Sequence, residues 1–443
     1  MKRIHPSIDT VEKLYGEQMP KAAADYRFTC HGIHIRCAEG VLLYHSMTGE
    51  LILLSEDEWE NRERDAALRE NLIRRWFLVP EDHDEKKHVD QVLTVLRLMQ
   101  KKKQNIRNFT VLPTTDCDAR CYYCFELGRP RRSMDERTAR DVADYIARVS
   151  GGDEISIKWF GGEPLYNAAA IDVITQELKR KGLRYRSTMT TNGYLFDEAL
   201  VRKAKEDWKL ERVQITLDGT EAVYNRVKAY IYREGNPFRR VMRNIGLLLD
   251  AGIKVSVRLN MGQRNADDLE RLVQTLAERF SDKAGFFVYA ERLADINQDG
   301  RVIQGENAAN KIRELNKKIR ALGLNHSVLQ DTFRLNGCMA DSDSSLTILP
   351  DGRLGKCEAE SEDKLVGSIY AETLDQSMIA AWKERMSCQL CESCVLYPQC
   401  RHPKLCRLAN TECTEYIQQN LRRRLEDMIL DTYEEARVEH EAD

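Results

Sequence analysis

Residues 109–125 read FTVLPTTDCDARCYYCF, and this stretch decides the fold class. Its first five residues, 109–113, predict a β-strand. Cys117, Cys121 and Cys124 follow in the next loop with the spacing CxxxCxxC. Thiolates are the usual protein ligands of iron–sulfur clusters, and three of them leave one corner of a four-iron cluster open for chemistry. Two alternatives remain: a zinc site, which usually takes a fourth local Cys or His, and three unliganded thiols.

Strand and helix patterns alternate from this stretch onward. The segments between the strands repeat apolar residues every three or four positions, as amphipathic helices do. The first of these helices is expected to begin with the capping box Ser133-x-x-Glu136. Six such units predict an α/β fold whose parallel sheet is covered by helices on one side and is closed or partly closed as a barrel. The expected strands are 109–113, 155–160, 184–189, 212–217, 253–259 and 285–289.

Four of the later strands end in segments that could line a site. Gly161-Gly162-Glu163-Pro164 ends the second strand, and its glycines would let the backbone approach a ligand closely. Thr190-Thr191-Asn192-Gly193 ends the third strand, and Asp218-Gly219 ends the fourth. Arg258-Leu259-Asn260 ends the fifth, where a surface arginine and a turn asparagine are an equal alternative.

These motifs resemble the radical S-adenosylmethionine (SAM) superfamily, in which CxxxCxxC carries an aromatic residue before its last cysteine. The resemblance implies a partial (β/α)6 TIM-like barrel and a [4Fe-4S] cluster held by Cys117, Cys121 and Cys124. It also implies that SAM chelates the open iron and is cleaved to methionine and a 5′-deoxyadenosyl radical, which takes a hydrogen atom from the substrate. Tyr123 would lie near the adenine, and Glu163 would help to bind the methionine amino group. The residues expected to contact SAM are Tyr123, Gly161, Gly162, Glu163, Pro164, Thr191, Asn192 and Asp218.

A second set of cysteines fills the C-terminal region and resembles the SPASM domain of radical SAM enzymes that modify peptides. The resemblance implies two auxiliary [4Fe-4S] clusters, hence three clusters in all. One would be held by Cys391, Cys394, Cys400 and Cys413, and the other by Cys338, Cys357 and Cys406. The family spacing would place a cysteine at Lys404, where this chain offers Cys406 instead. Cys388 is the fourth ligand of the second cluster or a spare thiol; without it, that cluster has an open iron for a substrate thiolate.

The first hundred residues read as a small α+β module. Strands are expected at 28–34, 41–44 and 51–54, and helices at 56–75 and 87–99. Such a unit resembles the winged-helix-like leader-recognition element of peptide maturases, which binds an extended leader by adding a strand to its sheet. A purely structural module is about as well supported. The expected domains are 1–104 (this module), 105–295 (barrel), 296–337 (a bridge with a helix at 306–322) and 338–443 (SPASM-like, ending in a helix at 414–437).

The amino-acid composition indicates which binding partners and which cell compartment to expect. The chain has 443 residues, more than one ordinary core supports. Its 68 Lys and Arg residues nearly balance its 71 Asp and Glu residues, so no charge field favours nucleic acid or an anionic membrane. There is no membrane-length apolar run and no apolar signal segment, so we expect a cytoplasmic protein. Thirteen cysteines in a reducing compartment indicate metal ligation. Cys30 and Cys37 stand apart and are expected to be small buried apolar residues.

The leading functional hypothesis is a radical SAM oxidoreductase that matures peptides. It would install an intramolecular cross-link, preferably a thioether and otherwise a carbon–carbon bond, in a ribosomally made precursor peptide with a leader. An electron donor such as flavodoxin or ferredoxin would reduce it. The alternatives are a formylglycine-forming sulfatase maturase and a non-catalytic iron–sulfur electron carrier.

Overall fold

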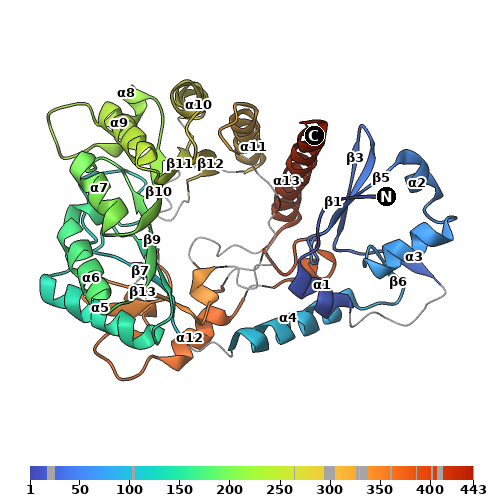
Figure 1. Cartoon of the computed structure of the whole chain (residues 1–443), viewed down its shortest axis with the longest axis horizontal. Helices are drawn as coiled ribbons and strands as arrows, with labels where there is room; N and C mark the ends of the chain where they lie inside the picture. The colour runs from blue at the N-terminus through green and yellow to red at the C-terminus, as the bar shows by residue number, and fades with distance from the viewer. Residues whose placement is uncertain are drawn as a thin grey trace.

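A computed structural model describes the chain apart from residues 17–24, 102–104, 264, 294–304, 326–328, 330–337, 360–361, 386, 401–402, 407–412 and 443. Figure 1 shows a curved parallel sheet with helices on its outer side, and a smaller sheet-containing module at the opposite end of the molecule. The C-terminal region joins the two. No helix in the described part of the chain is both long enough and apolar enough to span a bilayer.

The large sheet contains the six expected parallel strands in sequence order. They are β7 (Asn108–Val111), β8 (Ile155–Trp159), β9 (Tyr185–Thr191), β10 (Leu210–Leu217), β11 (Lys254–Met261) and β12 (Phe286–Arg292). The helices that follow them are α5 (Glu136–Ser150), the short η1 (Pro164–Asn167) with α6 (Ala168–Arg180), α7 (Glu198–Glu206), α8 (Glu221–Lys228), α9 (Pro237–Asp250), α10 (Ala266–Phe280) and α11 (Gly305–Ala321). The partial barrel predicted from the sequence is confirmed.

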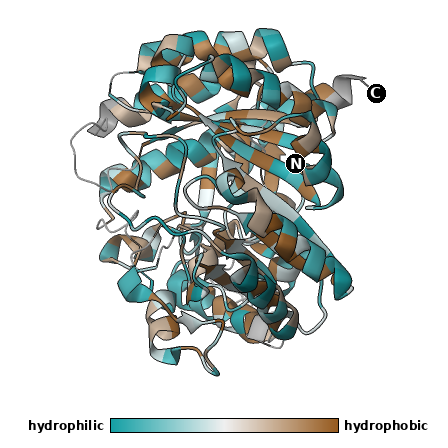
Figure 2. Ribbon diagram, turned by 90° about the vertical axis from the view of Figure 1, so that its left-hand side faces the viewer, coloured by the Kyte–Doolittle hydropathy of each residue, from teal (hydrophilic) through white to brown (hydrophobic). Residues whose placement is uncertain are grey.

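Alternation along each strand separates the core from the inner face of the barrel. In β8, Ile155, Ile157 and Trp159 are buried in the main core, which the helices share. Ser156 and Lys158 alternate with them and point to the other face, because successive strand residues face opposite sides. Figure 2 shows hydrophobic residues along the strands and hydrophilic residues on many outer helix turns.

The predicted capping box at the start of α5 is wrong. The helix begins at Glu136, and the side chain of Asp135 accepts a hydrogen bond from the backbone of Thr138. Ser133 instead contacts Thr114 through its hydroxyl at 2.9 Å. An aspartate two residues closer to the helix is at least as good a cap as serine, so it takes that position.

The C-terminal region extends the large sheet. β13 (Ser345–Ile348) pairs in parallel with β7, and β14 (Arg353–Gly355) and β15 (Gly367–Ser368) continue it as antiparallel strands. Pro350-Asp351-Gly352 connects β13 to β14 as a hairpin, and this hairpin shares a sheet with the barrel. The other elements here are η2 (Met339–Asp341), η3 (Glu362–Lys364), α12 (Gln376–Lys383), η4 (Gln389–Ser393) and α13 (Glu415–Ala442).

The N-terminal module is a four-stranded antiparallel sheet in the order β1-β5-β4-β3, with helices around it. Its elements are β1 (Lys2–His5), α1 (Asp9–Gly16), β2 (Tyr26–Phe28), β3 (Gly32–Cys37), β4 (Gly40–His45), β5 (Leu51–Leu54), α2 (Glu56–Asn61), α3 (Ala66–Arg74), β6 (Leu78–Pro80) and α4 (Glu85–Lys101). The single helix expected at 56–75 is two helices, because Asp65 caps the start of α3.

This module shares its core with the rest of the chain. One face of its sheet packs on α3 through Leu68 and Leu72, and the other packs on α13 through Ile429 and Tyr433. A third cluster joins α1 and α4 to the cysteine-rich segment; it includes Val11, Tyr15, Val89, Val92, Leu93, Cys394 and Tyr397. The red helix α13 accordingly lies beside the blue sheet in Figure 1. The module is built into the molecule through these apolar contacts.

Candidate active site at the carboxyl ends of the barrel strands

The loop after β7 carries Cys117, Cys121 and Cys124, and all three thiols are half-buried. Two backbone hydrogen bonds to residues 228 and 231 fix the middle of this loop. Arg120 N–H donates to the carbonyl of Lys228 (2.7 Å), and the carbonyl of Asp118 accepts from Ile231 N–H (2.9 Å). The segment after α8 therefore holds the middle of the cysteine loop in place.

The spacing of the three thiols bears on what they could hold. Among the residues that the structure describes, one set of Cys, His, Asp or Glu side chains has all its ligand atoms within 4.8 Å of one another, and it is not this one. Ligands of a single zinc ion surround one point, whereas cluster ligands bind separate iron corners. The wider spacing and the all-thiol donor set fit an iron–sulfur cluster better than a single ion.

Gly161 and Gly162 fasten this loop to the end of β8. A Cβ on Gly161 would lie 2.2 Å from the carbonyl oxygen of Thr114, and one on Gly162 would lie 2.2 Å from that of Asp116. The φ of Gly161 is also 127°, a conformation that disfavours side chains. The close approach expected here is thus made to the protein's own backbone just before Cys117.

Glu163 is buried beside this turn, with 1% of its surface exposed. Its carboxylate accepts hydrogen bonds from Thr191 Oγ1 (2.7 Å) and from the backbone N–H groups of Asn192 (2.8 Å) and Leu165 (3.1 Å). The Asn192 side chain also donates to Asp118 (2.7 Å). Burial, followed by the nearby charge of Asp118, raises the pKa of Glu163 to about 8. Because burial destabilises the ionised carboxylate of Glu163, a cation placed beside it would stabilise that ionised form strongly.

Tyr123 belongs to a second buried network. Its hydroxyl donates to Asp218 Oδ1 (2.7 Å), and the Asn260 amide donates to the same two oxygens at 3.0 and 3.1 Å. Lys228 Nζ lies 3.2 Å from Asp218 Oδ2 and donates to Thr216 Oγ1 (2.7 Å). Burial lowers the pKa of Lys228, but Asp218, Tyr123, Cys121 and Tyr224 together outweigh burial. The net pKa is therefore raised, and Lys228 stays protonated.

The C-terminal cysteines form two groups. In the outer group, Cys388 Sγ lies 3.8 Å from Cys391 Sγ. The other thiols of this group are Cys394, Cys400 and Cys413, and each lies close enough to Cys391 for their charges to interact. The described thiol contacts of Cys388 are with members of this group.

The inner group contains Cys338, Cys357 and Cys406. Besides burial, neighbouring thiols of this group help to raise the pKa of Cys338 and of Cys357, so the three side chains lie close together. Cys338 and Cys357 pack against the barrel core. Glu358, next to Cys357, pairs with Lys158 on the inner face of β8 at 2.7 Å. The inner group therefore lies on the barrel side of the C-terminal region, whereas the outer group packs on the N-terminal module.

Residues 111–276 match the family model described as the radical SAM superfamily. They form a radical SAM domain. A probable GTP 3′,8-cyclase of Methanococcus maripaludis is 28% identical over 151 residues, which is 34% of this chain and 48% of that protein. The chain spans about half the length of the curated relatives it matches.

Two solved structures share the fold over more of the chain. The structure of native anSMEcpe with bound AdoMet and Cp18Cys peptide is 15% identical with a TM-score of 0.57, covering 75% of this chain and 99% of that one. The structure of Streptococcus suis SuiB bound to precursor peptide SuiA is 14% identical with a TM-score of 0.51, covering 88% and 95%. At these identities the likeness shows a common fold.

The radical SAM domain also contains site residues that sequence reasoning did not single out. Lys228 ends a short helix that no sequence motif marks. Asp118 lies inside CxxxCxxC, at a position that the motif leaves unspecified. For the segment 258–260, a role in the site and a surface turn were equally supported by the sequence. The structure places Asn260 in the Tyr123 network, whereas Arg258 donates to the carbonyl of Arg292 on β12 (3.5 Å).

Proposed function

We propose that this chain is a peptide-modifying radical SAM enzyme that closes an intramolecular cross-link in a precursor peptide. The observation that carries the proposal is the extent of the shared fold. It continues beyond the radical SAM domain over 88% of the chain in the likeness to SuiB, which was solved with a precursor peptide. The anSMEcpe structure also contains a peptide. The domains 1–104, 105–295, 296–337 and 338–443 are part of this proposal.

Cys117, Cys121 and Cys124 would hold a [4Fe-4S] cluster, with SAM beside it. When bound and reduced, this cluster would supply the homolytic cleavage of SAM to methionine and a 5′-deoxyadenosyl radical. Glu163 would accept a hydrogen bond from the methionine ammonium, and the raised pKa of Glu163 would fall in response to that charge. Thr191 and Asn192 would keep the carboxylate oriented.

Tyr123 would lie against the adenine as a fixed aromatic surface. Asp218, Asn260 and Lys228 all contact its hydroxyl and would restrict its rotation. In this proposal Asp218 is a positioning residue, because its carboxylate is already engaged by Tyr123, Asn260 and Lys228. The backbone of Gly161, Gly162 and Pro164 would form the wall next to Glu163.

The inner cysteine group supports a thioether as the product. Cys338, Cys357 and Cys406 are three thiols on the barrel side, and Cys388 lies with the outer group. Three ligands would leave a position for a thiolate of the peptide. Closing a thioether removes one hydrogen from sulfur and one from carbon, and the auxiliary site would take the electron that remains after hydrogen-atom transfer. The outer group would then hold the third cluster through Cys391, Cys394, Cys400 and Cys413.

The N-terminal module would bind the leader of the peptide. β3 is an edge strand of the described sheet, so its outer side offers unpaired backbone groups for an added strand. Anchoring the leader there would raise the local concentration of the core peptide at the radical SAM domain. An electron donor of the flavodoxin or ferredoxin class would complete the system.

The decisive experiment supplies the enzyme with a Cys-containing precursor peptide that carries a leader. The anaerobic, reduced enzyme should convert it with the loss of two hydrogens per ring and the loss of one alkylatable thiol, as read by mass spectrometry. A product in which cysteine loses its sulfur would identify a formylglycine-forming enzyme instead. Formation of neither product, together with no 5′-deoxyadenosine, would indicate an electron carrier.

The leader hypothesis needs a separate test that spares the fold. Deleting residues 1–100 would expose the core around Cys394 and Tyr397, so loss of activity would not identify a leader site. Comparing the full precursor with a leaderless core peptide avoids this problem. The leaderless peptide should show a KM raised by roughly 10²-fold with little change in kcat. An equal KM for the two peptides would make the module purely structural.

A further inference from the structure

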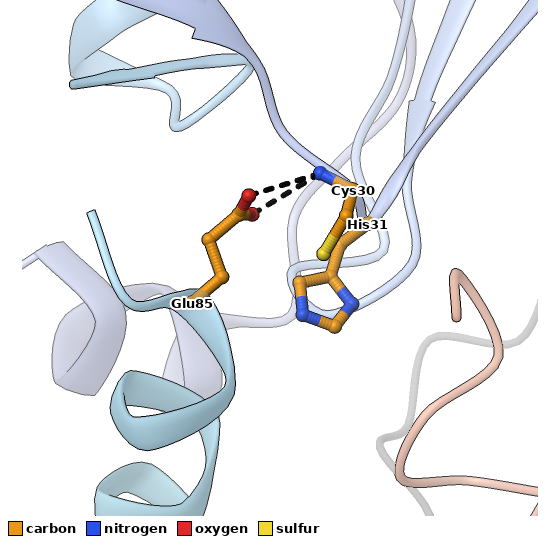
Figure 3. Close-up of side chains that lie close together, drawn as sticks. All are labelled: Cys30, His31 and Glu85. Carbon is orange, nitrogen blue, oxygen red and sulfur yellow. Dashed lines mark hydrogen bonds between the residues drawn. The ribbon is translucent and has the colours of Figure 1, made fainter. Parts of the chain in front are cut away.

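A group of three potential metal ligands lies in the N-terminal module, far from every cysteine group described above in sequence. It consists of Cys30, His31 and Glu85, and their ligand atoms all lie within 4.8 Å of one another. Cys30 and His31 form the turn between β2 and β3, and Glu85 is the first residue of α4. Figure 3 shows the thiol and the imidazole on the same side of the turn, facing the helix start.

Glu85 is held firmly against this turn. Its carboxylate accepts from the backbone N–H of Cys30 at 3.1 and 3.2 Å, from the Thr29 hydroxyl, and from the Arg27 guanidinium. The side chain is almost completely buried. These contacts arrange the carboxylate beside Cys30 without help from any ion.

His31 supplies the observation that points to a ligand. Its side chain is 2% exposed, and within the described part of the chain its Nδ1 has no hydrogen-bond partner. A buried polar atom without a partner is destabilising, so such atoms are rare in folded proteins.

We propose that Cys30, His31 and Glu85 bind one divalent transition-metal ion of the zinc class. A thiolate, an imidazole and a carboxylate are donors that Zn²⁺ accepts together, and a thiolate disfavours Mg²⁺ and Ca²⁺. The ion binds the buried imidazole and ties the β2–β3 turn to the start of α4. It is distinct from the iron–sulfur sites of the proposed enzyme.

Nearby histidines differ in their ability to supply a further ligand. His45 accepts from the backbone N–H groups of Met47 and Thr48 through Nδ1, so its proton is on Nε2, which cannot ligate. His88 lies one turn after Glu85 on α4, and its Nδ1 contacts His83 Nε2 (3.1 Å). Its Nε2 is buried and has no hydrogen-bond partner among the described residues. His88 is therefore the next donor to test.

An ion could reach the group from solvent. Cys30 and Glu85 line an open groove whose other side includes Glu392 and Ser393, between two cysteines of the outer group. The groove also contains His83 and Asp90. An ion bound here would brace the wall of the N-terminal module that faces the outer cysteine group.

The test uses the full-length protein with its iron–sulfur clusters reconstituted. After incubation with Zn²⁺ and desalting, zinc and iron are counted per chain. Cys30→Ser and His31→Gln should each lose one equivalent of zinc relative to the parent protein and keep the same iron. Cys37→Ser changes a half-buried cysteine at the other end of β3 and should keep both zinc and iron. Equal zinc in the parent protein and in both ligand variants would overturn the proposal.

A second measurement needs no substitution and covers variants that fail to fold. The parent protein is treated with N-ethylmaleimide with and without Zn²⁺, and labelling of Cys30 and Cys37 is followed by peptide mapping. Zinc should slow the labelling of Cys30 at least tenfold and leave Cys37 unchanged. An unchanged rate at Cys30 would contradict the site.

Discussion

The radical SAM cysteine loop and the outer C-terminal cysteine group contain the same kind of ligand, but they are supported differently. Cys117, Cys121 and Cys124 follow a central strand, and hydrogen bonds from residues 228 and 231 fix their loop. Cys388 to Cys413 lie on a short 3-10 helix and turns, with residues 401–402 and 407–412 outside the described part. The first loop is fixed by backbone hydrogen bonds to the barrel domain. The described part of the second group lies on short elements that pack on the N-terminal module, and we expect it to depend more on its metal for structure.

Removing iron should give the largest difference between the two regions. Anaerobic chelation should leave β7–β12 protected from hydrogen exchange, because their order rests on the apolar core. Residues 388–400 should lose much of their protection, since ligand bonds would supply part of their folding energy. Hydrogen exchange with mass spectrometry measures both regions in one experiment. Equal loss or equal retention of protection in the two regions would contradict the proposed difference in how they are supported.

Gly162→Ala tests how strongly the polypeptide shapes the first site. The new Cβ would lie 2.2 Å from the Asp116 carbonyl, so the cysteine loop must shift. We expect destabilisation of roughly 1–3 kcal/mol and weaker SAM binding, while the outer iron remains. Gly16→Ala is the matched control, because no residue in the described part of the chain lies within 4 Å of its added Cβ. Thermal melts and SAM titration compare the two, and equal behaviour would show that the loop is loosely held.

The Glu163→Gln variant tests the electrostatics of the same site, and its expected effect on stability is smaller. The pKa of Glu163 is raised from 4.5 to about 8 by burial first and by Asp118 second, so the folded state favours the protonated acid. Its contribution to stability is therefore complete below pH 4.5 and is lost as pH rises through 8. The stability of the parent relative to the Gln variant should fall across this window by up to about 1.4 kcal/mol per pH unit.

Anaerobic melts without SAM between pH 5 and pH 8 measure this slope. The exposed Glu211→Gln variant serves as the control and should follow the parent. Parallel pH profiles for the parent and Glu163→Gln would mean that Glu163 ionises normally.

The smallest effect is expected for Cys388→Ala. Cys388 is a fifth thiol in the outer group, beside the four proposed ligands, so iron content should not change. It is also close enough to Cys413 to replace it. Cys413→Ala alone should therefore keep part of the outer iron, and the double variant should lose one cluster's iron. Loss of a cluster in the single Cys388→Ala variant would make Cys388 a ligand.

The sequence predicted the repetitive part of the molecule well. Strands such as β8 alternate buried and half-buried residues, and the spacing of apolar residues marks the helices that cover them. It could not show that β13 would pair with β7 across more than 200 residues, because strand order depends on the whole fold. It also predicted the start of α5 wrongly, since Ser133 and Asp135 are both good caps and only packing selects between them.

The candidate site was predictable where a motif was local. Glu163 and Tyr123 were found from their segments, whereas Lys228 carries no local signal and enters through the fold. Cys30 was expected to be a small buried apolar residue, but it is half-buried next to Glu85. Fifty-five residues separate these two, so only the tertiary structure brings them together.

The central claim is that the three thiols after β7 support reductive cleavage of SAM. The direct measurement is 5′-deoxyadenosine formed by the anaerobic, reduced protein with SAM, compared with the Cys117→Ala, Cys121→Ala, Cys124→Ala triple variant. The parent should form it, and the triple variant should fall to background while keeping its C-terminal iron. Cleavage retained in the triple variant, or none in a fully iron-loaded parent, would contradict the account.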